Sequence, residues 1–291
     1  MFLVTAACAG IIAGAILLGG LLPYDAEIAF VSKQGEKSAI YRMDLRRQLA
    51  ARLTDNQFSA YSPVWSPDGQ HIAFYSDRDG SRDLYLMDAS GHNIRRLTDN
   101  HTSNDAPTWS PDGRHIAYFS QSETDYNIFI LNVENGTVRQ LLPDDLSWDS
   151  HPSWSPDGRR IAFVSTREEL NANIYVIDID GQNLRRLTDN PAEDYMPEWS
   201  PDGQQIAFVS RSVQDGNMTV HLMDADGKAL HHLGGERIAD QTPSWSPNGQ
   251  YIVFASTTAS GFDIFMMQSN GENVRQITTN QGDDVAPVWR P

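Results

Sequence analysis

Aspartates recur at one fixed place in this sequence, in the pattern Asp-x-x-Pro-x-Trp. The four that fit it are Asp149, Asp194, Asp240 and Asp284. If they gather at one end of a fold, their carboxylates could hold a Ca²⁺ ion, which prefers oxygen ligands, or a Lys or Arg of a partner. Each could also accept a hydrogen bond from the backbone N–H two residues on and so shape its own loop. The residue types leave both interpretations open, and we expect no resident cofactor.

Aromatic residues stand in the same loops. Trp148 is the one tryptophan outside the periodic set described below, and Tyr195 and Tyr61 hold similar places, with His151 and His101 nearby. Aromatic side chains on exposed loops are typical anchors of protein interfaces. Alternatively, Trp148 folds back over a hydrophobic gap. The predicted partner-binding residues are Trp148, Asp149, Tyr195, Asp194, Asp240 and Asp284.

Catalytic motifs are scarce in this chain. The sequence has no Gly-x-Ser-x-Gly nucleophile elbow, no His-Glu-x-x-His and no Gly-rich phosphate loop. The net charge of −16 argues against a nucleic-acid partner, because phosphate binding needs a basic face. The single cysteine, Cys8, excludes an intrachain disulfide and a thiolate metal cluster.

A repeated pentapeptide organises the rest of the chain. Trp-Ser-Pro-Asp-Gly begins at Trp65, Trp109, Trp154 and Trp199, and returns with Asn for Asp at Trp245. The tryptophans, including Trp289, are 44 to 46 residues apart. A period of that length built from strand-like units is typical of a β-propeller, in which each repeat is a four-stranded blade.

Each repeat predicts the same order of strands. Pro, Asp and Gly favour a tight turn, so the pentapeptide is a hairpin between a first and a second strand. The second strand, such as Ile161-Ala162-Phe163, is apolar on both faces, as expected inside a stack of sheets. The fourth, such as Leu184 to Thr188, is the most polar and belongs on the outer rim, with its arginines facing solvent.

The two ends of the chain complete one blade. Residues 28–54 supply a second, third and fourth strand without a tryptophan strand before them. Residues 286–289 supply a lone tryptophan strand. The sequence therefore predicts an all-β, six-bladed β-propeller closed by a C-terminal strand that joins the N-terminal blade, with the Asp-x-x-Pro loops at one mouth of the central channel.

These repeats closely resemble the TolB-type, or WD40-like, propeller repeat. The matching residues are Pro-x-Trp-Ser-Pro-Asp-Gly, Ile-Ala-Phe, Ile-Tyr-x-Met-Asp and Arg-Leu-Thr, over residues 28–289. The resemblance implies a six-bladed propeller of the kind found in bacterial envelope proteins, where family members mostly act as docking platforms for other proteins.

The N-terminal segment is expected to be one hydrophobic helix. Residues 1–22 carry no charge, and roughly 20 apolar residues suffice to span a bilayer. A cleaved signal peptide normally begins with basic residues, which are missing here, so we favour an uncleaved anchor. The predicted domains are 1–23, an anchor or signal segment, and 24–291, the propeller. The nearest basic residues, Lys33 and Lys37, follow the span, but large domains translocate largely regardless of such charge, so the side stays open.

The sequence as a whole favours a non-enzymatic, membrane-anchored monomer that docks a protein or peptide at the channel mouth. Its expected location is the extracytoplasmic or periplasmic side of a bacterial envelope. The alternatives are a channel-mouth hydrolase or lyase acting on carbohydrate or peptide, and an extracytoplasmic sensor module.

Overall fold

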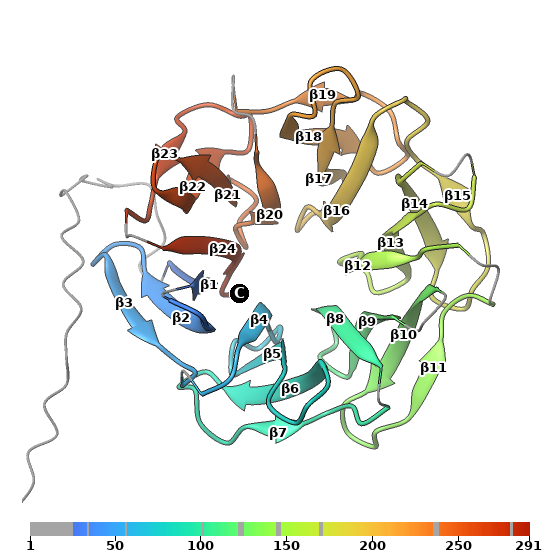
Figure 1. The fold of residues 1–291 in the computed structure, drawn as a ribbon. Helices are drawn as coiled ribbons and strands as arrows, with labels where there is room; N and C mark the ends of the chain where they lie inside the picture. The colour runs from blue at the N-terminus through green and yellow to red at the C-terminus, as the bar shows by residue number, and fades with distance from the viewer. Residues whose placement is uncertain are drawn as a thin grey trace, which may run out of the picture.

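Six antiparallel four-stranded sheets form a ring around a central channel, which confirms the six-bladed propeller (Figure 1). The computed structural model describes residues 26–33, 35–55, 57–100, 102–121, 125–143, 147–168, 171–234, 239–279 and 282–291. The predicted N-terminal helix lies outside these residues. Within them, no helix is long and apolar enough to cross a membrane.

The strands of each blade are given from the channel outward. Blade 1 contains β24 (Asp283–Trp289), β1 (Glu27–Lys33), β2 (Ser38–Asp44) and β3 (Leu49–Arg52); blade 2 contains β4 (Ala60–Trp65), β5 (His71–Ser76), β6 (Asp83–Asp88) and β7 (Arg95–Arg96); blade 3 contains β8 (Ser103–Trp109), β9 (His115–Gln121), β10 (Tyr126–Asn132) and β11 (Val138–Gln140). Blade 4 contains β12 (Ser150–Trp154), β13 (Arg160–Ser165), β14 (Asn173–Asp178) and β15 (Arg185–Arg186); blade 5 contains β16 (Glu193–Trp199), β17 (Gln205–Arg211), β18 (Met218–Asp224) and β19 (His231–His232); blade 6 contains β20 (Gln241–Trp245), β21 (Tyr251–Thr258), β22 (Gly261–Gln268) and β23 (Arg275–Gln276).

The chain ends meet in blade 1. Strand β24 pairs antiparallel with β1, with Trp289 opposite Ile28, as the count of strands in the sequence predicts. Arg290 Nη1 lies 2.6 Å from Glu27 Oε2 and adds an ion pair across the same junction. The ring is therefore closed by strand pairing between residues at opposite ends of the sequence.

The pentapeptides form the turns between the first and second strands. In blade 4, Ser155 Oγ donates to Asp157 Oδ1 at 2.6 Å and accepts from the backbone N–H of Arg160 at 2.9 Å. Gly158 has a φ of 68°, a conformation that glycine adopts without steric cost. The turn is thus closed by local bonds that its own residue types dictate.

The core lies between neighbouring blades. Trp199, only 5% exposed, packs with Val164 and Ile174 of blade 4 and with Phe208 of its own blade. Burial of such a side chain removes 150–250 Å² of surface from water, so the tryptophans hold adjacent sheets together.

The rim strands differ from expectation in one respect. Arg95 is exposed as predicted, but Arg96 turns inward, and its Nη2 lies 2.7 Å from Oδ2 of the fully buried Asp83. A buried carboxylate needs a cation or several donors, and this need outweighs the solvation of the arginine.

Candidate functional site

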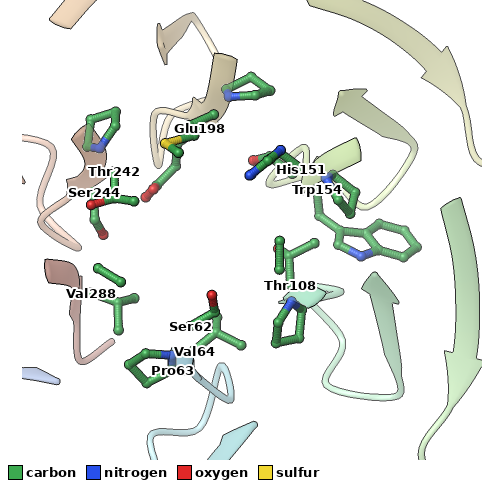
Figure 2. A pocket seen from close by; sticks show the side chains of 18 of the residues that line it. Ser62, Pro63, Val64, Thr108, His151, Trp154, Glu198, Thr242, Ser244 and Val288 are labelled. Atoms are coloured by element: carbon green, nitrogen blue, oxygen red, sulfur yellow. The ribbon is translucent and has the colours of Figure 1, made fainter. Parts of the chain in front are cut away.

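The six innermost strands enclose a cavity of about 490 Å³ on the axis of the ring (Figure 2). Each strand contributes a proline and the residue on either side of it. These triplets are residues 62–64, 106–108, 151–153, 196–198, 242–244 and 286–288. The site is therefore built mainly from the x-Pro-x part of the repeat, and Asp105, Trp154 and Trp199 complete the lining.

A β-bulge at each proline aims these residues at the channel. In blade 2, Tyr61 and Val64 pair with Tyr75 and Ala73, so the intervening Ser62 and Pro63 fall out of register. The same shift occurs in the other five blades. The residue before each proline has a φ between 46° and 54°, a left-handed conformation that costs a non-glycine residue about 1–2 kcal/mol. A strain repeated in every blade marks the bulge as a fixed feature of the ring.

The lining differs between the two halves of the channel (Figure 2). Strands β12, β16 and β20 present mostly polar side chains, which are His151, Ser153, Met196, Glu198, Thr242 and Ser244. Strands β24 and β4 present mostly small or apolar ones, which are Ala286, Val288, Ser62 and Val64, and β8 presents Asp105, Ala106 and Thr108. The cavity therefore suits a ligand with a polar side and an apolar side.

Glu198 is a half-buried carboxylic acid in the polar half. Its Oε1 accepts the backbone N–H of Trp245 at 3.0 Å, and Ser244 bonds to the same carboxyl group. Burial raises the pKa of Glu198 to about 7 despite these two donors. In blade 4 the equivalent residue is Ser153, whose Oγ accepts the N–H of Trp199 at 3.4 Å. Glu198 thus keeps a bond common to neighbouring blades and adds an ionisable group to the channel.

Two further titratable residues line the cavity. Burial lowers the pKa of His151 to about 4, so the imidazole is neutral at pH 7. Asp105 accepts hydrogen bonds from Ser62 Oγ at 3.1 Å and from the backbone N–H of Ala106 at 2.5 Å. Burial raises the pKa of Asp105 to about 6, and its hydrogen bond with Tyr75 further holds it in place.

Trp148, in the loop that enters β12, is 55% exposed and lies beside Tyr126 of β10, the third strand out from the channel. Its ring packs on Tyr126 at 5.3 Å between centroids, and its backbone N–H donates to Thr166 Oγ1 at 3.1 Å. Phe119 continues the contact inward, 5.8 Å from Tyr126 and 5.4 Å from His151. A continuous aromatic column therefore runs from the exposed Trp148 to the channel lining.

The structure buries the four repeated aspartates. Asp149, Asp194, Asp240 and Asp284 are all buried, at 2%, 0%, 1% and 0% exposure. Asp149 pairs with Arg167 at 2.7 Å, and Asp194 accepts from Ser210 Oγ at 2.6 Å and from Asn190 at 3.1 Å. None of the four lines the cavity, because the bulge turns the residues next to the proline, rather than the aspartates, toward the channel. Asp149 and Asp194 instead fasten their loops to the blades.

The remaining predicted residues lie apart from the channel lining. Tyr195 is half-buried in β16 beside Glu193 and Arg211, which form an ion pair at 2.8 Å. Tyr61 is half-buried and stacks on Tyr75 at 5.1 Å between centroids. His101 lies outside the described residues. Within the described ranges, no group of three or more His, Cys, Asp or Glu residues is arranged to hold a metal ion.

The model of the TolB beta propeller domain matches residues 20–147 and 106–291. The chain belongs to this family. Among solved structures, TolB from Acinetobacter baumannii is 24% identical with a TM-score of 0.81, over 91% of this chain and 67% of that one. Putative TolB from Agrobacterium tumefaciens is 22% identical with a TM-score of 0.73, over 92% of this chain and 99% of that one. Hydrazine synthase of Kuenenia stuttgartiensis is 17% identical with a TM-score of 0.78, over 92% and 47%. No curated protein matches the sequence.

Sequence reasoning missed Glu198 and Asp105 as channel residues. Glu198 carries a visible signal, because the residues before the other five repeat tryptophans are Val64, Thr108, Ser153, Ser244 and Val288, all small and uncharged. A charged residue at such a position marks a departure from the repeat. Asp105 gives a weaker signal, since it stands beside Asn104, which fills the aspartate position of its own repeat.

Proposed function

We propose that this propeller docks a partner polypeptide on the face that carries the channel mouth. The observation that supports it is Trp148, a large aromatic side chain that is 55% exposed and braced from below by Tyr126. Exposed, preorganised tryptophans carry a large share of binding energy in many interfaces. The proposal agrees with the family of the chain, whose fold provides a rigid ring with variable loops at one face.

In this proposal Trp148 and Tyr195 contact the partner, and the buried aspartates hold the loops on which such residues stand. Asp149 holds Arg167, whose side chain is 12% exposed, and so fixes the loop on which Trp148 stands. Asp194, Asp240 and Asp284 fasten the equivalent loops in the following blades. The uncharged residues 1–22 anchor the propeller to a membrane in a bacterial envelope, a location supported by the likeness to two bacterial TolB structures.

Affinity capture from native membranes tests the docking face. We expect the full chain to retain a specific partner and Trp148→Ala to bind it about 30-fold more weakly, as for a central aromatic anchor. The matched control is Leu184→Ala, which removes a 40% exposed apolar side chain beside the turn between β14 and β15, at the opposite face. Equal recovery of the partner by Trp148→Ala and Leu184→Ala, with both variants folded, would contradict the proposal.

A second candidate is an enzyme that uses the channel. Glu198, with a pKa raised to about 7, has the properties of a general acid or base, and His151 lines the same cavity. One structural neighbour is oligogalacturonate lyase from Vibrio parahaemolyticus, 16% identical with a TM-score of 0.56. A polyanionic substrate fits poorly here, because the described lining contains Asp105 and Glu198 but no Lys or Arg. Incubating the full chain with oligogalacturonate and following unsaturated product by absorbance tests this candidate.

A further inference from the structure

Glu198 differs from Asp83, Asp149 and Asp105 in its electrostatic surroundings. Asp83 pairs with Arg96 at 2.7 Å, and Asp149 pairs with Arg167 at 2.7 Å. Asp105 accepts several hydrogen bonds, and the positive charge of Arg82 stabilises its ionised form. Glu198 has two neutral donors, and no Lys or Arg stands among the described residues around the cavity. When Glu198 is ionised, no cation of the described cavity lining therefore balances its charge.

A second polar atom on the same side of the cavity lacks a partner. Thr242 lines the channel on β20, the strand next to Glu198, and its Oγ1 is buried without a hydrogen bond within the described structure. A buried hydroxyl left unsatisfied costs about 1–3 kcal/mol. A ligand that brings polar hydrogens into this half of the channel would relieve that cost and neutralise Glu198 at once.

The shape and composition of the cavity limit the ligand further. Its volume of about 490 Å³ is within the usual range of ligand sites, roughly 300–1,000 Å³. Val64, Pro63 and Val288 present apolar surface across the cavity from Glu198 (Figure 2). Lys and Arg side chains place an apolar stem against such a surface and keep the charged head at a polar one.

We propose that the docked polypeptide inserts a Lys or Arg side chain into the channel, where its cationic group pairs with Glu198. This inference rests on the proposed docking function and adds to it the chemistry that selects the partner. Trp148 holds the partner on the face of the entry loops, and Glu198 specifies a basic residue that reaches into the channel.

Selection from a random linear peptide display library tests this proposal with the full chain in detergent. We expect peptides enriched on the wild type to share a Lys or Arg at one position. Replacing it with norleucine in a synthetic peptide, or using Glu198→Gln, should weaken binding at least about 30-fold, as for truncation of a buried charge pair. Glu198→Ser, which restores the residue of blades 4 and 6 at this place, provides a second variant should Glu198→Gln fold poorly. Glu272→Gln, at an exposed turn, controls for the loss of one negative charge.

The pH dependence of the same binding gives an independent measurement. Only the ionised form of Glu198 pairs with the cation, so affinity should fall about tenfold from pH 8 to pH 6 for a group with a pKa of about 7. His151 and Asp105 are the other titratable groups that line the cavity. The part of the fall that is due to Glu198 should be missing in Glu198→Gln.

The outcomes separate the inference from the docking function beneath it. Peptides without a shared basic residue that bind Glu198→Gln as tightly as the wild type would overturn the inference and leave docking intact. If no peptide is enriched on the folded wild type, docking itself fails, and the inference fails with it.

Discussion

The two faces of the ring are fastened in different ways. One face carries the pentapeptide turns, and the other carries the loops that enter the innermost strands. In the turns the same bond recurs, from Ser66 to Asp68 at 2.5 Å, from Ser155 to Asp157 at 2.6 Å and, with Asn in place of Asp, from Ser246 to Asn248 at 2.8 Å. These bonds join residues two apart in the sequence. Each turn therefore closes without help from the rest of the molecule.

In the entry loops the backbone is repeated but the partners are not. Asp149 pairs with Arg167, Asp194 bonds to Ser210, and Asn104 donates to Asn100 at 2.8 Å. Ser210 stands on β17 and Arg167 just after β13, whereas Asn100 belongs to the entry loop itself, so each of these loops is fastened by a different set of contacts. The difference shows that repetition in the sequence marks the scaffold, whereas variation on a repeated backbone marks the surface available for recognition.

Removal of the closing strand β24, which belongs to the repeated scaffold, should lower the stability of the protein more than any change in the loops. Deleting residues 283–291 removes Trp289, which is 4% exposed and packs with Ile28 and Phe30, together with the ion pair of Arg290. We expect loss of the cooperative unfolding transition, because a domain is stable by only about 5–15 kcal/mol in total. Thermal circular dichroism of the full chain and the truncated chain measures it.

Deletion of Pro291 alone, an exposed residue, is the control and should leave the melting curve unchanged. A truncated chain that melts as the full chain does would show that the ring does not depend on β24.

Replacing one aspartate on each face compares the two kinds of loop directly. Asp149→Ala leaves the largely buried Arg167 without its carboxylate, and should lower the free energy of unfolding by about 3–5 kcal/mol. Asp157→Ala removes bonds from Ser155 and from the backbone N–H of Arg159 in an exposed turn, and should cost about 1 kcal/mol. Urea denaturation measures both variants. Equal losses would mean that the two faces are fastened in the same way.

The pH dependence of stability should show the effect of Glu198. The pKa of Glu198 is about 7 in the folded protein, against 4.5 for an ordinary glutamate such as that of the unfolded chain. Between pH 4.5 and pH 7 the folded protein therefore binds more protons than the unfolded chain. Stability contributed by this group should therefore increase as pH falls from above 7 toward 4.5, by roughly 3 kcal/mol at most. The difference between wild type and Glu198→Gln in urea titrations from pH 5 to pH 8 isolates it, since other acids are common to both. A difference that does not change with pH would show that Glu198 is not held in its protonated form.

Most of the fold can be predicted from the sequence, because its signals are local and repeated. The strand order, the pentapeptide turns and the inter-blade tryptophans follow from turn chemistry and apolar runs, and the structure confirms them. The site is less predictable. Trp148 is exposed, but the aspartates three residues before the prolines are buried, and no catalytic or binding motif in the sequence marks Glu198, which lines the channel.

By itself the sequence determined the number of blades, since the repeats can be counted along it, and the residues that close each turn, since the bonds of a turn span only a few residues. Only the tertiary structure decided which side chains face the axis. The β-bulge at each proline turns the side chains of the two flanking residues toward the axis. In blade 5 the bulge has a φ of 54° at Met196, and Asp194, two positions earlier, is buried. This orientation depends on how the innermost strand pairs with the second strand and packs against the neighbouring blades. Such contacts cannot be read from the sequence of one repeat.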